Sequence, residues 1–251
     1  MTAPSSEYAL EVVSLRKAFG GLTVTQDVSL KVRPGERRLI SGPNGAGKTT
    51  LFNQISGDLR PNSGMIRLFG ADITHLPPYQ RAHSGLSRTY QIITLFAGDT
   101  LEHNVSLGLL GLRASRWQMW RPMSFYRDLA SEARRTLDAV GLLHLADHPI
   151  SDIAYGEKRR VELAVALAQK PRVLLLDEPL AGLSNTERST VKSLIASISL
   201  ETTVIMIEHD MDTALDLAET VTLLNYGRVI VDGKRDAAIA DERTREVYLG
   251  T

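Results

Sequence analysis

The sequence predicts an α/β fold with a mostly parallel sheet, an N-terminal antiparallel β subdomain and an inserted α-helical subdomain. In the second half of the chain, unbroken apolar runs such as residues 173–176 and 204–207 alternate with helical stretches. Such runs are typical of parallel strands buried on both faces by helices. From residue 101 to 146 the β pattern disappears, and Leu, Ala and Arg recur at helical spacing. For this chain of 251 residues we expect a single domain, residues 1–251, whose helical insertion spans approximately 99–165.

The first part of the chain predicts short strands separated by turns. Gly20-Gly21 and Pro34-Gly35 mark two of these turns, and a proline pair opens a short helix. One expected strand, residues 37–41, is unusual because it contains two arginines where a buried apolar run is expected. The other elements expected here are strands at 8–15, 28–32, 64–70 and 87–91 and helices at 49–55 and 77–82.

After Pro149, which ends the helical stretch, strands and helices alternate again. Asn225-Tyr226-Gly227 separates two apolar runs and predicts a hairpin. The expected elements are helices at 157–169, 186–199 and 211–218, strands at 173–176, 204–207, 221–224 and 228–231, and a helical C-terminus.

Charge and composition exclude several classes of function. Lys plus Arg total 29 and Asp plus Glu total 29, so no net charge attracts nucleic acid and we expect no nucleic-acid partner. Cys is absent, which excludes a disulfide scaffold, a thiolate nucleophile and a Cys-ligated zinc site. Neither a membrane-spanning run of about 20 apolar residues nor a signal peptide is present. We therefore expect a soluble protein of a reducing compartment, most simply the cytoplasm.

A glycine-rich loop fits the pattern G-x-x-x-x-G-K-[ST] and predicts a phosphate site. Glycines let backbone N–H groups converge on phosphate oxygens, and the following helix presents its positive end there. Lys48 would reach the β- and γ-phosphates, Thr49 would bind Mg²⁺, and Thr50 could contact the α-phosphate. A chance match in such a chain is on the order of one in a hundred. The loop consists of Gly42, Pro43, Asn44, Gly45, Ala46, Gly47, Lys48 and Thr49.

Two acids follow the apolar run 173–176, at the end of a strand where ligand sites of open α/β sheets lie. Asp177 is suited to hold Mg²⁺ through its water shell, and Glu178 to orient and activate the attacking water. The alternative interpretation is a strand that ends in ordinary solvated acids. This is common for one acid alone, but it is far less frequent when a phosphate loop is present in the same chain. Together, loop and acids favour transfer of a phosphoryl group from ATP to water.

Between these elements lies Ile153-Ala154-Tyr155-Gly156-Glu157, ahead of an amphipathic helix. The glycine-rich loop, this segment and the strand that ends in Asp177-Glu178 follow one another as in the ATP-binding cassette (ABC) family of P-loop NTPases, which the chain resembles. In that family the signature L-S-G-G-Q comes just before the strand that carries the two acids. The resemblance implies that Ala154, Tyr155, Gly156 and Glu157 contact the γ-phosphate of an ATP held by a second subunit. Ala154 lacks the hydroxyl that the family's Ser donates, so the backbone N–H groups remain for this contact.

The resemblance extends to four further positions. Gln91 matches the Q-loop glutamine, which touches Mg²⁺ or the attacking water, and His209 matches the switch histidine at the γ-phosphate. Phe19 matches the aromatic residue that stacks on adenine. Ser184 ends a segment similar to the D-loop, where many members have Asp. Taken alone, His209 would be interpreted as a solvated histidine and Phe19 as a core residue. Their places in the order of the family's motifs support the roles that the resemblance implies.

The resemblance covers nearly the whole chain, and it looks most like the ATP-binding subunits of branched-chain amino-acid uptake transporters. It implies ATP and Mg²⁺ as cofactors, and partners of three kinds: a second ATP-binding subunit, identical or related, integral membrane permease subunits and, indirectly, a substrate-binding protein. The expected location is peripheral, on the cytoplasmic face of the plasma (inner) membrane. Relatives in this branch move other amino acids, urea, amides or lipopolysaccharide. The residues that carry this likeness lie at 19–22, 89–91, 95–96, 153–156 and 248–250.

Other readings stay open at this point. A soluble ABC ATPase acting on nucleic acid or ribosomes would usually have tandem cassettes or long coiled-coil insertions, and an exporter of lipopolysaccharide shares the same branch. A P-loop kinase would need an acceptor pocket. Trp117 and Trp120 lie in an Arg-rich stretch that we expect near the membrane subunits and the lipid surface. His144 and His148 have the spacing of a zinc pair but no accompanying third ligand in sequence.

Overall fold

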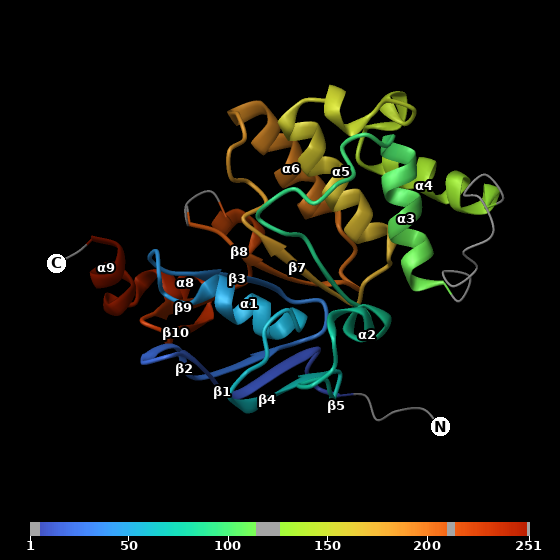
Figure 1. Cartoon of the computed structure of the whole chain (residues 1–251). Coiled ribbons are helices and arrows are strands. Elements are labelled where there is room, and N and C mark those ends of the chain that lie inside the picture. Colours follow the sequence, from blue (N-terminus) through green and yellow to red (C-terminus); the bar gives the residue numbers. More distant parts are fainter. Residues whose placement is uncertain (1–5, 114–125, 210–213, 250–251) are drawn as a thin grey trace. The chain divides into compact units, whose positions relative to one another are not determined.

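The computed structural model describes residues 6–113, 126–209 and 214–249 (Figure 1). Two compact units make up the chain. The first comprises Met1–Arg88, Arg172–Pro179 and Ile198–Thr251, and the second comprises Thr89–Pro171 and Leu180–Ser197. Trp117 and Trp120 lie outside the described residues.

The first unit contains a six-stranded sheet in the order β10-β9-β3-β8-β7-β6. All neighbours pair in parallel except β9 and β10, which form the predicted hairpin. The mostly parallel sheet predicted from the apolar runs is therefore confirmed. Its strands are β3 (Arg37–Ser41), β6 (Leu86–Arg88), β7 (Val173–Asp177), β8 (Thr203–Ile207), β9 (Thr220–Asn225) and β10 (Arg228–Lys234).

The arginines of β3 do not prevent its burial, because acids surround them. The side chain of Arg38 is 5% exposed; it donates to Glu36 at 2.7 Å and also pairs with Asp232. Arg37 donates to the carbonyl of Ile198 at 2.6 Å. A buried charge is tolerated when it is paired and hydrogen-bonded, so this strand lies in the middle of the sheet despite its polar residues.

A four-stranded antiparallel sheet, in the order β2-β1-β4-β5, completes the strands of the first unit (Figure 1). Its strands are β1 (Leu10–Phe19), β2 (Leu22–Val32), β4 (Ser63–Leu68) and β5 (Ala71–Asp72). The first two are longer than the expected 8–15 and 28–32. The polar residues between the two expected strands also pair across the hairpin, with register shifts. A prediction from apolar runs misses such residues, because one face of an antiparallel sheet can lie in solvent.

Two helices pack with these strands. α1 (Lys48–Ser56) contributes Leu51, Phe52 and Ile55 to the core shared with both sheets, and α2 (Pro78–His83) carries a buried arginine. Arg81 donates to the last carbonyls of α1, on Gln54 and Ile55, at 2.7 Å each. Burial lowers the pKa of Arg81 to about 10. This guanidinium therefore caps the carboxyl end of the helix that starts at Lys48.

The second unit is helical, as the β-poor middle of the sequence predicts. Leu101, Leu129, Leu137 and Val161 belong to its own buried core. Thr100 caps the first helix by accepting the His103 N–H at 3.1 Å. Its helices are α3 (Leu101–Leu112), α4 (Arg127–Ala139), α5 (Tyr155–Ala168) and α6 (Asn185–Ser197). A single domain with its insertion at 99–165 stays a prediction.

The remaining helices are short. The expected helix at 211–218 falls partly on residues 210–213, which lie outside the described residues, and a 3-10 turn spans Leu215–Leu217. The helical C-terminus consists of α8 (Arg235–Ala240) and α9 (Glu242–Leu249). Among the described residues, no helix has both the length and the apolar character needed to cross a membrane.

Candidate functional site

The glycine-rich loop connects β3, which ends at Ser41, to α1, which begins at Lys48. Only glycine fits at two of its positions. At Gly42, φ is 145° and an added Cβ would lie 2.0 Å from the carbonyl oxygen of Leu224. At Gly47, φ is 99° and an added Cβ would lie 2.6 Å from the carbonyl oxygen of Val24. The loop therefore packs directly on neighbouring backbone and presents the free N–H groups of the first turn of α1.

The side chain of Lys48 is held inside this loop. Its Nζ donates to the carbonyls of Gly42 at 2.6 Å and Pro43 at 3.0 Å. Burial lowers the pKa of Lys48, while the carboxylates of Glu178 and Asp177 act in the opposite direction. An ammonium group and helix N–H groups around one loop are donors that suit a polyphosphate. The chemistry of the loop residues therefore fits the phosphates of a nucleoside triphosphate. Of the others in the motif, Asn44, Gly45 and Thr49 are exposed, Thr50 is half-buried and Ala46 is buried.

Strand β7 delivers the two acids at its carboxyl end. All five of its residues are buried, and β7 lies between β8 and β6 in the sheet. The Asp177 side chain is 1% exposed, and its Oδ2 accepts from the guanidinium of Arg88 at 2.7 Å. A buried carboxylate is the kind of hard oxygen ligand that Mg²⁺ prefers.

Glu178 and His209 are in contact. His209 Nε2 lies 2.6 Å from Glu178 Oε1. Glu178 has a positive φ of 49°, and its N–H donates to the carbonyl of Ile207 at 3.0 Å. A left-handed backbone at a glutamate costs on the order of 1–3 kcal/mol, so the neighbouring strand β8 holds this residue in a strained conformation. His209 follows the same strand, which explains why the two side chains meet.

Sequence reasoning missed Arg88. It ends β6, next to β7, and its guanidinium donates to Asp177, to Asn53 at 2.7 Å and to Ser56 at 2.9 Å. Arg88 thereby links the C-terminal half of α1 to the carboxylate of Asp177, the predicted Mg²⁺ ligand. The signal that could have found it is the rule used for Asp177: a charged residue at the carboxyl end of a parallel strand belongs to the ligand edge of the sheet.

In the second unit, Arg159 joins the Q-loop to helix α5. Its guanidinium donates to the carbonyls of Tyr90 at 2.9 Å and Gln91 at 2.7 Å. It also pairs with Glu162 at 2.9 Å and lies 5.5 Å from the ring centroid of Tyr155. The backbone of Gln91 is fixed by these contacts, while its side chain is exposed.

The signature residues form the start of α5. Ala154 precedes the helix, and its N–H donates to Glu157 Oε2 at 2.8 Å. Tyr155 is 44% exposed, whereas Gly156 is buried. The Glu187 side chain lies against Gly156, where an added Cβ would be 2.3 Å from Glu187 Oε1.

Phe19 lies at the end of β1 with half of its surface exposed, and Lys17 Nζ lies 5.2 Å from its ring centroid. The described residues, among them His144 and His148, contain no cluster of three His, Asp or Glu side chains arranged for a metal. The assignment of Mg²⁺ to Thr49, Gln91 and Asp177 stays a prediction, in which substrate phosphates and water would supply the further ligands.

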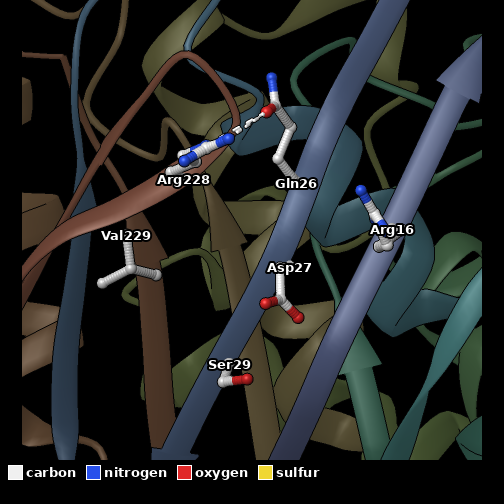
Figure 2. Close-up of a pocket in the computed structure, with 6 residues that line it drawn as sticks. All are labelled: Arg16, Gln26, Asp27, Ser29, Arg228 and Val229. Atoms are coloured by element: carbon white, nitrogen blue, oxygen red, sulfur yellow. Dashed lines mark hydrogen bonds between the residues drawn. The ribbon is translucent and has the colours of Figure 1, made fainter.

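A separate hollow of 410 Å³ lies on the antiparallel side of the first unit (Figure 2). Arg228 donates to Gln26 Oε1 across it, at 3.0 and 3.1 Å. None of the predicted site residues lines this hollow, which is formed by Arg16, Gln26, Asp27, Ser29, Arg228 and Val229.

Comparison with known proteins agrees with this geometry. A family described as "ABC transporter" matches residues 25–181. The chain belongs to the ABC transporter family, as an ATP-binding subunit with the P-loop ATPase fold. The resemblance predicted from the motifs is therefore confirmed, and the chain is an ATPase that binds nucleotide.

Its relatives include ATP-binding proteins of amino-acid transport. BraF of Pseudomonas aeruginosa, a high-affinity branched-chain amino acid transport ATP-binding protein, is 36% identical over 257 residues, covering 96% of this chain and 97% of BraF. LivG of Salmonella typhimurium, with the same description, is 34% identical over 98% of this chain and 99% of its own length. Among solved structures, an ATP-binding cassette of an ABC transporter in its ADP conformation matches with a TM-score of 0.85 and 26% identity, over 97% of this chain and 99% of that one.

Proposed function

We propose that this ATPase binds ATP and Mg²⁺ at the glycine-rich loop and transfers the γ-phosphoryl group to water. The contact between His209 Nε2 and Glu178 Oε1, at 2.6 Å, is the observation that carries this assignment. It brings a carboxylate and an imidazole together at the carboxyl ends of β7 and β8, where Asp177 also lies, and Lys48 begins the helix that follows β3. A base must be held in place by a hydrogen-bonding partner to act on a water molecule.

Each residue then has a defined role. Glu178 accepts a proton from the attacking water, and His209 holds the Glu178 carboxylate and donates to the γ-phosphate. Lys48 leaves the loop carbonyls to pair with the β- and γ-phosphates. When bound through Thr49, Asp177 and Gln91, Mg²⁺ supplies charge neutralisation of the phosphates. Phe19, with its exposed ring, stacks on adenine.

The second half of the nucleotide site comes from another molecule. The start of α5, from Ala154 to Glu157, contacts the γ-phosphate of an ATP held by a second ATP-binding subunit, which is another copy or a related chain. ATP binding favours the closed dimer and hydrolysis releases it, so the γ-phosphate biases a two-state element.

This cycle powers import of branched-chain or related amino acids through separate permease subunits, supplied by a substrate-binding protein. The relatives BraF and LivG, both described as branched-chain amino acid transport proteins, support the choice of solute. The subunit would then lie on the cytoplasmic face of the inner membrane, bound to the permease. The balance of 29 basic and 29 acidic residues favours this assignment over a role on nucleic acid.

Glu178→Gln tests the catalytic assignment. The amide keeps the shape of the side chain but cannot take a proton, so we expect ATP binding to survive and ATP-driven association to accumulate. Light scattering with Mg²⁺ and ATP measures the association, and phosphate release measures hydrolysis. Hydrolysis at the wild-type rate would refute Glu178 as the base.

Purification of the intact complex from its native membrane tests the partners. We expect hydrophobic permease chains to co-purify, together with either this ATPase alone or a related one. Binding to nucleic acid that weakens with salt, and no permease in the complex, would support the soluble alternative instead.

A further inference from the structure

A two-residue turn between β9 and β10 packs against the glycine-rich loop. The N–H of Gly227 donates to the carbonyl of Ala46 at 2.9 Å. Both central residues of the turn, Tyr226 and Gly227, have positive φ, of 45° and 74°, which a two-residue hairpin of type I′ requires. The turn therefore holds one carbonyl of the predicted phosphate site at a defined position.

The backbone of this turn, the backbone of the loop and that of strand β2 meet without a side chain between them. A Cβ added at Gly227 would lie 2.3 Å from the carbonyl oxygen of Val24, and one added at Gly47 would lie 2.6 Å from the same oxygen. The Cα of Gly227 is only 3.5 Å from the position of that Gly47 Cβ. Because closely packed backbone transmits strain, a displacement of the turn displaces the loop.

Gln26, on β2, holds the turn through both its backbone and its side chain. Its N–H donates to the carbonyl of Gly227 at 2.7 Å, and its side-chain amide donates to the carbonyl of Tyr226 at 3.3 Å. The amide oxygen accepts from the guanidinium of Arg228 at 3.0 and 3.1 Å (Figure 2). The left-handed backbone of Tyr226 is unfavourable for a residue other than glycine, so these bonds help to keep the turn in its conformation.

The bond from Gly227 orients one peptide group of the loop. The peptide between Ala46 and Gly47 is trans, and in a trans peptide the C=O of one residue and the N–H of the next point in opposite directions. Because the carbonyl of Ala46 points at Gly227, the N–H of Gly47 points away from the turn. Gly47 directly precedes Lys48 at the start of α1, so this N–H belongs to the donors available to a phosphate.

We propose that Gln26 is a positioning residue for ATP: through the turn at Gly227 it aims the N–H of Gly47 at the phosphates. This inference rests on the proposed binding of ATP at the glycine-rich loop. A donor that is fixed in advance binds an anion without the entropy cost of ordering it. Gln26 therefore sets the affinity for ATP from outside the nucleotide site.

This role predicts a specific kinetic signature. Loss of a preset donor weakens the binding of ATP, while Glu178 and His209 remain in place for hydrolysis. The dissociation constant and KM for ATP should therefore rise together, and kcat should change little. A purely structural role predicts instead a lower stability of the nucleotide-free protein, with normal affinity in the molecules that stay folded.

The experiment compares Gly227→Ala and Gln26→Met with two matched controls. The methyl group at position 227 meets the carbonyl of Val24 and pushes the turn away from β2. Methionine keeps the length of the Gln26 side chain but makes none of its hydrogen bonds. Gly233→Ala is the control on β10, because a Cβ there meets nothing within 4 Å, and Gln80→Met is the control at an exposed position of α2.

Titration with a fluorescent ATP analogue measures the dissociation constant, phosphate release measures KM and kcat, and thermal unfolding without nucleotide measures stability. We expect the dissociation constant and KM to rise roughly tenfold in Gly227→Ala, the value of one charge-assisted hydrogen bond. In Gln26→Met, which keeps the backbone bond to the turn, we expect a rise of about threefold. The two controls should match the wild type, and kcat should stay within about twofold of wild type in all four variants.

Wild-type affinity in both Gly227→Ala and Gln26→Met, with weakened binding by Lys48→Met, would overturn the positioning role alone. A loss confined to stability or to kcat, or an equal loss of affinity in the controls, would overturn it as well. If Gly227→Ala does not fold, Gln26→Met decides by itself. Wild-type affinity in Lys48→Met too would overturn the placement of ATP at the loop, and the positioning role with it.

Discussion

Arg88 and Asp177 form a buried ion pair, with 2.7 Å between the guanidinium and Oδ2 and side chains that are 5% and 1% exposed. They end neighbouring parallel strands, so the pairing follows from the topology of the sheet. The pair fixes the position of the carboxylate that we assign to Mg²⁺.

Arg88→Gln should therefore lower the free energy of unfolding by about 3 kcal/mol, because removing one partner of a buried pair leaves the other charge poorly compensated. Urea unfolding measures this loss. The exposed Arg60 offers a matched control, and Arg60→Gln should change stability by less than about 0.5 kcal/mol. Equal effects of the two substitutions would show that the pair with Asp177 contributes nothing special.

His209→Ala should reduce kcat for ATP hydrolysis by about 100-fold, since the Glu178 carboxylate loses the partner that orients it. Nucleotide affinity should change little, because Lys48 and the loop remain intact. Steady-state phosphate release and binding of a fluorescent ATP analogue separate the two effects. His75→Ala, at an exposed position, serves as control. A loss of affinity that matches the loss of rate would argue against a role confined to the chemical step.

Lys48→Met should weaken ATP binding by roughly 10- to 100-fold, the value of one charge-assisted contact to phosphate. The methionine keeps an apolar stem in the buried position but supplies no donor. Titration with the fluorescent analogue gives the dissociation constant. Lys234→Met, at the exposed end of β10, should bind ATP as wild type does. Wild-type affinity in Lys48→Met would exclude this side chain from the phosphate site.

Gly156→Ala should destabilise the protein by about 1 kcal/mol and reduce ATP-driven association, because the new methyl group pushes the Glu187 side chain away from its bonds with Ser184. Gly111→Ala is the matched control: it lies in α3, where an added Cβ meets nothing within 4 Å. That change should be neutral or stabilising by up to about 1 kcal/mol. Thermal unfolding and light scattering measure both. Normal association and unchanged stability of Gly156→Ala would show that the Glu187 side chain moves aside without cost.

The pH dependence of stability should reveal Glu162. Burial raises the pKa of this carboxyl above 4.5, although Arg159 acts to lower it. The folded state thus binds the proton more tightly than the unfolded state, and stability decreases as pH rises through the window that starts near 4.5. Urea unfolding of wild type and Glu162→Gln at stepped pH should show this decline in the wild type only. Parallel curves for the two proteins would refute the shift.

The sequence alone determined the sheet type, the glycine-rich loop and the pair Asp177-Glu178. Each of these is a local constraint. An apolar run without alternation is typical of burial on both faces, and a glycine-rich loop ahead of Lys48-Thr49 suits the binding of phosphate by backbone N–H groups. Such constraints are visible in a few consecutive residues, and the family resemblance followed from their order along the chain.

The tertiary structure alone decided which side chains meet. Arg88 and Asp177 are 89 residues apart, and no spacing rule connects Gly156 with Glu187. These contacts exist because β6 pairs with β7 and because α5 and α6 start side by side. The same packing buries Arg38 and half-buries Arg37 of β3, although two arginines seemed unfit for a central strand. Pairing between distant segments depends on the summed packing of whole elements, and no short pattern contains that information.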